Sequence, residues 1–259
     1  MKERSLYITV LLFAQLILSV SVAAIPGEEL RRASMLVVML LPILLFRTPP
    51  EGTKRLRILP EKGALPLLLL LPAFTLVICL TSLGWGALAN LLGITVKGAE
   101  PIKPLTMAIL LDAAVPAIGE ECFVRGAIFS VLRPHGRRTA VIGSAIVFSL
   151  MHASLAQIPY AFLAGILLGM LYEVSGGLLL PILFHFFSNL LSLFLLFGAR
   201  PLPLLLGVGA ATVLGILLLF RLRPRPIPEA PATDVGDLRA FLLSPILLWI
   251  GAIVFIMLL

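Results

Sequence analysis

The chain has 259 residues, of which 60% are hydrophobic and only 13% are charged, with a net charge of +7. A soluble globular protein has about 25% charged residues because its surface must be hydrated, so this composition excludes a soluble domain. The basic residues lie in short segments between long apolar runs, which is a pattern of membrane topology. Basic residues interleaved with aromatic ones are absent, so we expect no nucleic-acid partner.

The apolar runs are long enough to cross a bilayer repeatedly, since one span takes about 20 apolar residues. The first run, at 6–25, also resembles a signal peptide, but further runs follow at once and favour a retained span. We therefore predict an all-α, polytopic transmembrane helical bundle that forms a single domain over 1–259. Its eight to nine spans are expected at about 6–25, 34–46, 64–92, 105–132, 139–151, 157–172, 177–197, 202–220 and 238–259.

The distribution of Lys and Arg predicts the orientation. If the N-terminus is cytoplasmic, inner segments hold 14 of the 20 basic residues and outer segments hold five, while Arg125 lies within a span. Cytoplasmic loops carry an excess of Lys and Arg, so we predict a cytoplasmic N-terminus. The segment 223–237 is rich in Pro and Ala and is expected to be a stiff linker before the terminal helix at 238–259.

Ionisable side chains inside spans are costly, by about 2.5–3.5 kcal/mol each, so each needs a partner or a function. Glu121 and Arg125 are four residues apart and share one helix face, where they can pair. Glu120 points about 100° away, so this pairing leaves it unexplained. Neutralisation of all three charges within the bundle is the plain alternative. The polar residues inside the expected spans are Asp112, Glu120, Glu121, Arg125, His152, His185 and Asn189.

Two histidines complete the pattern. Phe148 lies one helical turn before His152, so its ring can wall the imidazole, and Asn189 lies one turn after His185. Counted along their spans, Glu120 and both histidines fall near the bilayer centre. We therefore predict one buried polar site near the midplane.

Three ordered motifs, Glu120-Glu121-x-x-x-Arg125-Gly126, Phe148-x-x-x-His152 and His185-x-x-x-Asn189, resemble those of the CAAX prenyl protease and bacteriocin-processing (CPBP) family. The similarity covers about 104–193, which we take as the catalytic core. Many members place an aromatic residue directly before the arginine, where this chain has Val124.

The resemblance implies a glutamate-type intramembrane endopeptidase that is reached from the cytoplasmic side. Glu120 and His152 would hold and activate the attacking water, while His185 and Asn189 would stabilise the oxyanion. Glu121 and Arg125 would brace the helix, with Phe148 beside the site. The chemistry agrees, because a desolvated carboxylate can act as a base, and a neutral imidazole N–H and an amide can donate to an oxyanion.

Three alternatives stay open. Zinc could bind two histidines and a glutamate, although the His-Glu-x-x-His pattern of many zinc peptidases is absent. A non-catalytic immunity or maturation protein could bind a membrane peptide in the same cavity. A transporter also uses midplane polar groups, but the internal repeats of transporters are absent. We expect no cofactor, and we expect as partners the lipid bilayer and a membrane-associated or lipidated peptide such as a prenylated CAAX substrate.

Several other residues are given structural roles. Asp112 is expected to be satisfied at a kink caused by Pro116. Cys79 and Cys122 are expected to be buried thiols. The remaining polar residues near span ends, expected to be interfacial anchors or cavity rim, are Tyr160, Tyr172 and Glu173.

Overall fold

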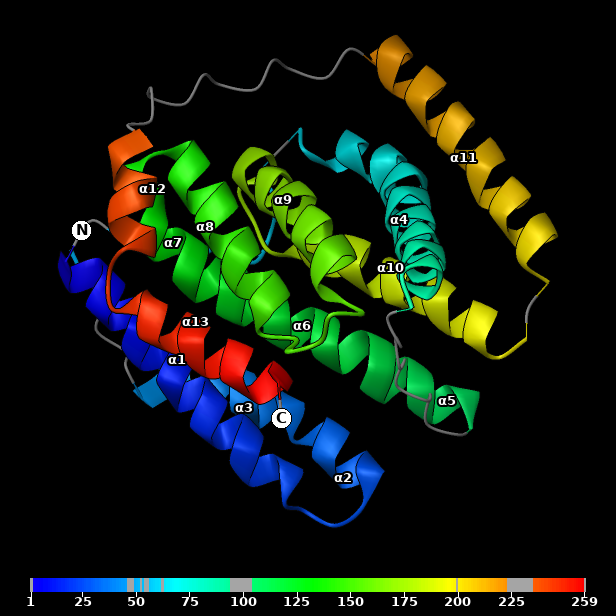
Figure 1. The fold of residues 1–259 in the computed structure, drawn as a ribbon. Helices are drawn as coiled ribbons and strands as arrows, with labels where there is room; N and C mark the ends of the chain where they lie inside the picture. Colours follow the sequence, from blue (N-terminus) through cyan, green and yellow to red (C-terminus); the bar gives the residue numbers. More distant parts are fainter. Residues whose placement is uncertain are drawn as a thin grey trace.

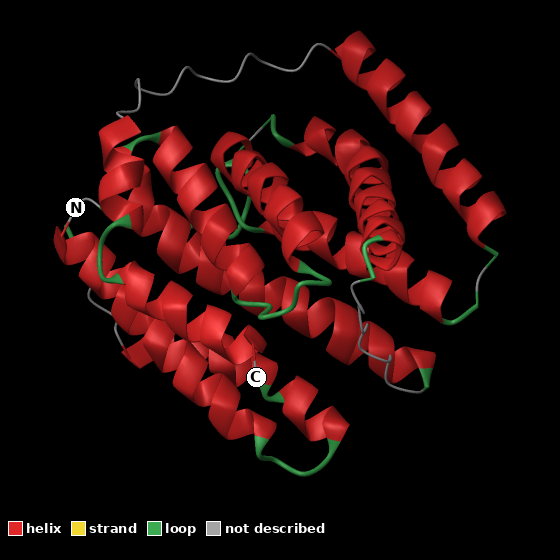
Figure 2. Cartoon of the chain, in the orientation of Figure 1, coloured by secondary structure: helices red, strands yellow, loops and turns green. Residues whose placement is uncertain are grey.

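Every regular element of the protein is a helix, with no strand in the residues that the structure describes (Figure 2). The all-α helical bundle expected from the composition is thereby confirmed. The computed structural model describes residues 2–45, 49–51, 53, 56–61, 63–93, 104–198, 200–222 and 235–258.

The central helices α4, α6, α8, α9 and α10 are flanked by α1, α3 and α13 on one side and by α11 on the other (Figure 1). In chain order the elements are α1 (Lys2–Ala23), α2 (Glu28–Ala33), α3 (Met35–Leu45), η1 (Leu65–Leu70), α4 (Leu71–Leu91), α5 (Leu105–Ala108), η2 (Ile109–Ala114), α6 (Val115–Glu121), η3 (Cys122–Phe129), α7 (Ser130–Leu132), η4 (Arg133–His135), α8 (Arg137–Leu150), α9 (Ile158–Ser175), α10 (Leu179–Leu196), α11 (Pro201–Leu222), α12 (Val235–Leu242) and α13 (Ile246–Leu258).

The segment from α5 to α7 is one continuous helix over 105–132, at the position of the fourth expected span. Two of its stretches, η2 and η3, have π-helical hydrogen bonding and flank the seven-residue α6. Pro116 has no N–H to donate to a preceding carbonyl, which disturbs the regular α pattern at the junction of η2 and α6. Single π turns within α-helices occur often at functional sites, and α6 carries both glutamates.

Helices α8 and α9 approach closely because α9 presents glycines at positions 165 and 169. A Cβ atom on Gly165 would come within 2.9 Å of the Ala145 Cα, a distance that real Cβ atoms essentially never show. Small residues spaced four apart let two helices approach within a membrane, where van der Waals packing drives association. This contact holds α9 against α8, the helix that leads into the second motif.

One end of the bundle is tied together by residues of several basic segments, and we call it the basic end. Arg4 donates to the Val131 carbonyl oxygen at 2.9 Å, and Arg133 forms an ion pair with Glu173 at 2.5 Å. The segment 57–61 joins the same end through backbone hydrogen bonds to the residues that connect α9 and α10.

The opposite end, which we call the distal end, is held by different contacts. Trp85, near the end of α4, donates from Nε1 to the Leu155 carbonyl oxygen between α8 and α9 at 2.9 Å. Arg32 of α2 forms an ion pair with Asp112 of η2. Because α6 lies between the two ends, its glutamates are in the middle of the bundle.

Large apolar side chains fill the bundle between α6 and the basic end. Phe129 and Tyr172 are fully buried and meet edge to face, with ring centroids 5.2 Å apart. Helix α1 contributes Ile8, Leu11 and Leu12, which are also fully buried. The first expected span is thus an integral part of the core.

Five helical segments are long and apolar enough to cross a membrane, so the total of eight to nine spans is not confirmed by length and composition. Helices α3, α8 and α13 have only 11, 14 and 13 residues. The segment 105–132 carries four charged residues, which lower its hydropathy. The five segments are Lys2–Ala23, Leu65–Leu91, Ile158–Ser175, Leu179–Leu196 and Leu202–Arg221.

The C-terminal region differs from the expectation in one respect. Most of the segment expected as a linker at 223–237 lies outside the described residues, which resume with α12. The terminal helix expected over 238–259 is divided into α12 and α13, with Pro245 between them, because proline cannot continue a helical hydrogen-bond pattern. Phe241 and Trp249 are fully buried and anchor both helices on the core.

Candidate active site

The two neighbouring glutamates of α6 occupy different environments. Glu121 is fully buried, whereas the Glu120 side chain is 12% exposed and lines a cavity. Consecutive residues of a helix point about 100° apart, which accounts for this separation.

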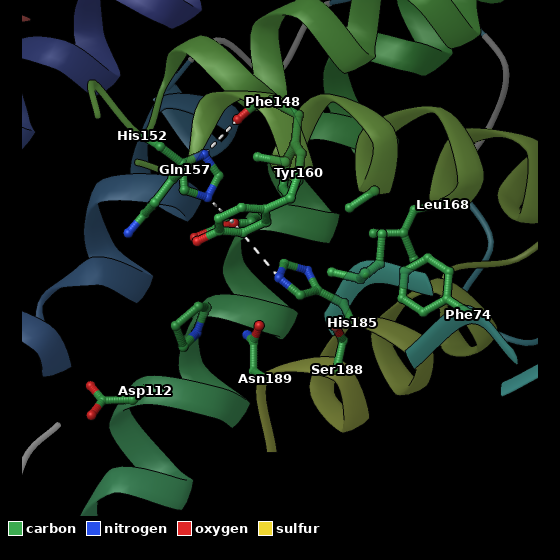
Figure 3. A pocket seen from close by; sticks show the side chains of 15 residues that line it. Phe74, Asp112, Phe148, His152, Gln157, Tyr160, Leu168, His185, Ser188 and Asn189 are labelled. Carbon is green, nitrogen blue, oxygen red and sulfur yellow. Dashed lines mark hydrogen bonds and ion pairs between the residues drawn. The ribbon is translucent and has the colours of Figure 1, made fainter. Parts of the chain in front are cut away.

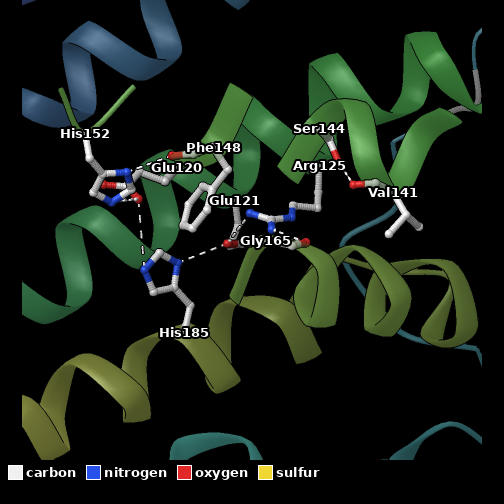
Figure 4. Close-up of polar contacts among 9 residues, drawn as sticks. All are labelled: Glu120, Glu121, Arg125, Val141, Ser144, Phe148, His152, Gly165 and His185. Atoms are coloured by element: carbon white, nitrogen blue, oxygen red, sulfur yellow. Dashed lines mark hydrogen bonds and ion pairs between the residues drawn. The ribbon is translucent and has the colours of Figure 1, made fainter. Parts of the chain in front are cut away.

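Glu121 is the centre of a buried polar network (Figure 4). Its Oε1 accepts a hydrogen bond from Arg125 Nη1 at 2.8 Å, the ion pair expected from their spacing. Arg125 Nη2 donates to the Gly165 carbonyl oxygen at 3.0 Å, which ties the pair to α9. Removing one partner of a buried ion pair is strongly destabilising, so this network is a structural element of the site.

The Phe148 ring separates this network from the rest of the site. On one side the Arg125 guanidinium lies 4.6 Å from the ring centroid, in cation–π geometry. On the other, the imidazoles of His152 and His185 meet the ring edge to face, at 5.1 and 5.6 Å. Phe148 therefore walls both histidines, where the sequence predicted only His152.

His185 joins the network of Glu121, which spacing along the sequence does not predict. Its Nδ1 lies 3.0 Å from Glu121 Oε1, across 64 residues of chain. A carboxylate paired with arginine only accepts hydrogen bonds, so Nδ1 of His185 carries the hydrogen. The contact depends on how α10 packs on α6. Helical spacing predicts the pairing of Glu121 with Arg125 only, and not a third partner.

His152 lies in the turn that follows α8, two residues past the end of the helix in which the sequence placed it. Its Nδ1 lies 2.7 Å from the Phe148 carbonyl oxygen and therefore also carries the hydrogen. The next residue, Ala153, has a φ of 46°, a left-handed conformation that is uncommon outside glycine. This turn ends α8 and fixes the imidazole towards α6.

Glu120 lies between the two histidines. Its Oε2 is 3.9 Å from Nε2 of His152 and 4.0 Å from Nε2 of His185. These distances are too long for direct hydrogen bonds and suit contact through a water molecule. Since both Nδ1 atoms carry hydrogens, each ring turns Nε2 towards Glu120, as an acceptor in a neutral ring and as a donor in a protonated one. Glu120 Oε2 and the two Nε2 atoms thus converge on one point.

These three groups line a cavity of about 230 Å³ (Figure 3). Asn189 lines it too, so the structure brings all four candidate catalytic residues together. Phe74 and Leu168 form part of an apolar wall. The sequence gave no role to Gln157 and placed Tyr160 only as an anchor or rim, yet both line the cavity. Their position at the start of α9, soon after His152 in the sequence, could have indicated that they lie near the site.

Asp112 also lines the cavity. We expected it to be satisfied locally at a kink, but it forms an ion pair with Arg32 of α2, 80 residues away. Of the other residues expected at the rim, Tyr172 is fully buried in the core and Glu173 pairs with Arg133 at the basic end.

The chemistry of the site is limited to carboxylate, imidazole, amide and hydroxyl groups. Within the described ranges, no group of three or more His, Cys, Asp and Glu side chains is arranged to hold a metal ion. The two cysteines are free thiols: Cys79 is buried and Cys122 is partly buried.

A glutamate and two histidines gathered in the middle of an apolar helical bundle define an integral membrane protein with an intramembrane polar site. The sequence model of the family described as Type II CAAX prenyl endopeptidase Rce1-like matches residues 102–191, which contain all three motifs. The match confirms the resemblance that the motifs indicated, to a family of CAAX-type proteases, over this part of the chain. No curated protein and no solved structure matches the chain.

Proposed function

We propose that this protein is an intramembrane endopeptidase that hydrolyses a peptide bond of a membrane-associated substrate with a water molecule activated by Glu120 and His152. The position of Glu120 Oε2 carries the proposal, because it lies 3.9 and 4.0 Å from the Nε2 atoms of the two histidines. A water molecule between these atoms would be within hydrogen-bond reach of both a carboxylate base and an imidazole acceptor, which supports the proposal.

Glu120 acts as the general base. In the part of the chain that the structure describes, its buried Oε2 has no hydrogen-bond partner and so can accept from water. The water donates one hydrogen bond to Oε2 and one to Nε2 of His152. As its oxygen bonds to the carbonyl carbon, Glu120 takes one proton and the carbonyl oxygen becomes an oxyanion. When the C–N bond breaks, Glu120 gives this proton to the leaving nitrogen, and a carboxylic acid and an amine result.

The two histidines have different roles because their Nδ1 atoms have different partners. His152 donates to a neutral carbonyl, which favours a neutral ring that accepts through Nε2. His185 donates to the carboxylate of Glu121, which fixes its ring and turns Nε2 towards the cavity. A neutral His185 carries its single hydrogen on Nδ1, so it donates to an oxyanion from Nε2 only when it is protonated. This replaces the neutral donor expected from spacing.

Asn189 supplies the second oxyanion donor. It lies one helical turn after His185 on α10 and lines the same cavity (Figure 3). One donor aimed at a developing oxyanion typically contributes 10²–10³ in rate.

Catalysis is proposed to need neither a metal ion nor a cofactor, with carboxylate and imidazole groups carrying the proton transfers. Zinc remains the rival, because neutral imidazole nitrogens and a carboxylate are its usual ligand types. The N-terminus is proposed to be cytoplasmic, from the excess of 14 basic residues against five in the expected inner and outer segments.

A second candidate function is binding without hydrolysis, as in a membrane protein of the immunity or maturation type. The convergence of Glu120 Oε2 and the two imidazole Nε2 atoms favours it specifically, since a carboxylate and imidazoles can also hydrogen-bond the backbone of a bound peptide. The two functions differ in what happens to the peptide, so cleavage separates them.

The test is a mass-spectrometric cleavage assay of the purified full-length protein against farnesylated CAAX peptides and a panel of other lipidated and plain peptides, with and without chelator. We expect cleavage by the wild type and by Glu61→Gln, an exposed carboxylate at the basic end, and none by Glu120→Gln. Full activity of Glu120→Gln would contradict the mechanism. Loss of activity on chelation, restored by zinc, would favour the metal-dependent alternative.

A further inference from the structure

The face of α9 that lines the cavity is apolar except in its first turn, where Tyr160 lies (Figure 3). The lining residues of this helix fall on one side of it, because they are spaced one, four and eight positions from the first. Tyr160 is thus the one polar side chain that α9, a helix described throughout its length, turns to the cavity. The four residues are Tyr160, Ala161, Ala164 and Leu168.

The Tyr160 hydroxyl is available for hydrogen bonding. The side chain is half-buried, and within the described ranges its hydroxyl forms no hydrogen bond. Tyrosine hydroxyls that leave bulk water usually have a partner. The charged side chain that interacts with this hydroxyl electrostatically is Glu120. A water molecule or a substrate in the cavity can therefore supply the partner, next to the reactive carboxylate.

The catalytic cluster is short of hydrogen-bond donors. An ionised Glu120 only accepts, and the neutral rings of His152 and His185 carry their hydrogen on Nδ1 and offer Nε2 as an acceptor. Hydrolysis of a peptide bond places negative charge on the former carbonyl oxygen, which needs donors aimed at it. Among the four candidate catalytic residues, Asn189 alone donates whatever the protonation state of the imidazoles.

We propose that Tyr160 is a further catalytic residue, whose O–H donates a hydrogen bond to the oxyanion of the tetrahedral intermediate beside the amide of Asn189. As the water oxygen bonds to the carbonyl carbon and Glu120 takes the proton, the carbonyl electron pair moves to the oxygen, which accepts from the phenol. The phenol keeps its proton throughout, and the hydrogen bond weakens when the C–N bond breaks and the carbonyl forms again. This inference rests on the proposed function, because it assigns a donor to that hydrolysis.

Two other side chains of the lining can donate, those of Gln157 and Ser188. Gln157 precedes α9, and its amide ends a flexible side chain that loses much rotamer freedom when it is fixed. A serine hydroxyl within a helix, such as that of Ser188, can donate instead to a backbone carbonyl one turn earlier. Tyr160 carries its hydroxyl on a rigid ring with two torsions, and a donor fixed in advance is the kind that stabilises an oxyanion best.

Tyr160→Phe tests the role directly, because it removes the hydroxyl and keeps the ring. On a peptide that the wild type cleaves, we expect kcat to fall by about 10²–10³ with KM little changed, as for the loss of one oxyanion donor. Tyr172→Phe, at the other end of α9 and buried in the core, is the matched control and should keep the wild-type kcat. An unchanged kcat, or a rise in KM alone, would overturn the inference.

The placement of the hydroxyl can be measured without any substrate. The chain has three tyrosines, so Tyr7→Phe together with Tyr172→Phe leaves Tyr160 as the single one. When this full-length protein is labelled with 3-fluorotyrosine, its ¹⁹F resonance reports the surroundings of the Tyr160 hydroxyl. We expect Glu120→Gln to shift the resonance and Glu61→Gln, which changes an exposed carboxylate at the basic end, to leave it in place.

The two measurements separate the inference from the proposed function. A resonance that does not respond to Glu120→Gln would overturn the inference, whether or not a cleaved peptide is found. The expected shift, with no cleavage of any peptide by the wild type, would support the place of Tyr160 in the site and count against the proposed function. Cleavage that Glu120→Gln abolishes and Tyr160→Phe leaves at full rate would support the function and overturn the inference.

Discussion

The two adjacent carboxylates of α6 have opposite environments in the two halves of the bundle. Towards the basic end, Glu121 is held by two cationic or hydrogen-bonding partners, Arg125 and His185, and is closed off from solvent. Towards the distal end, Glu120 faces a cavity and two imidazole nitrogens that it does not touch. Stability and reactivity are thus assigned to neighbouring residues of one helix, with the Phe148 ring between them.

Glu120→Gln tests the difference between the two halves most directly. Because this carboxylate has long contacts only, we expect kcat to fall by about 10³–10⁴, in keeping with the loss of a general base, while the melting temperature changes little. Peptide cleavage and thermal unfolding in detergent measure the two quantities. A large fall in melting temperature would mean that Glu120 is a structural residue.

Glu121→Gln, in contrast, should lower the stability of the protein strongly. It leaves the buried Arg125 without its charge partner, so we expect a loss of about 3–5 kcal/mol in the free energy of unfolding, measured by thermal or chemical unfolding. Activity should fall as well, because His185 loses the carboxylate that orients its ring. A stable and fully active variant would contradict the division between the two halves.

Asn189→Ala tests the distal half alone. We expect kcat to fall by about 10²–10³ with KM little changed, as for the loss of one oxyanion donor, and the fold to be retained. Steady-state kinetics on a cleaved peptide measure it, with Asn90→Ala on α4, an exposed residue outside the cavity, as the matched control. A rise in KM alone would assign Asn189 to substrate binding instead.

Gly165→Ala tests the basic half alone. The added methyl group would collide with the Ala145 backbone and shift the carbonyl that binds Arg125, so we expect a loss of about 1–3 kcal/mol in stability. Gly84→Ala on α4 is the control, because a Cβ atom there meets nothing within 4 Å. Equal melting temperatures for the two variants would show that α8 and α9 can separate without loss.

Much of this fold could be predicted from apolar length alone. Helix boundaries agree with the expected spans to within a few residues for α1, for η1 and α4 taken together, and for α9 and α10, because long apolar runs between charged segments leave little choice. The division at Pro245 and the π-helical stretches around α6 were missed. They depend on how neighbouring helices satisfy displaced backbone groups, and apolar periodicity is insensitive to that.

The sequence predicted which residues form the site but not all of the contacts between them. Helical spacing identified the pairing of Glu121 with Arg125 and left Glu120 as the surplus carboxylate. It could not show that His185 turns its Nδ1 to Glu121, or that Asp112 pairs with Arg32. Both contacts join elements far apart in the chain, and only tertiary packing fixes which ring nitrogen faces which carboxylate.

The placement of Glu121 and Arg125 one turn apart also bears on biogenesis. Their charges compensate each other within a single helix, so this pair needs no partner from another helix when the segment enters the bilayer. Glu120 has no such local partner, and the histidines that surround it arrive later in synthesis. The nascent chain thus acquires its structural ion pair at insertion, and its reactive cluster is completed only when α8 and α10 have joined the bundle.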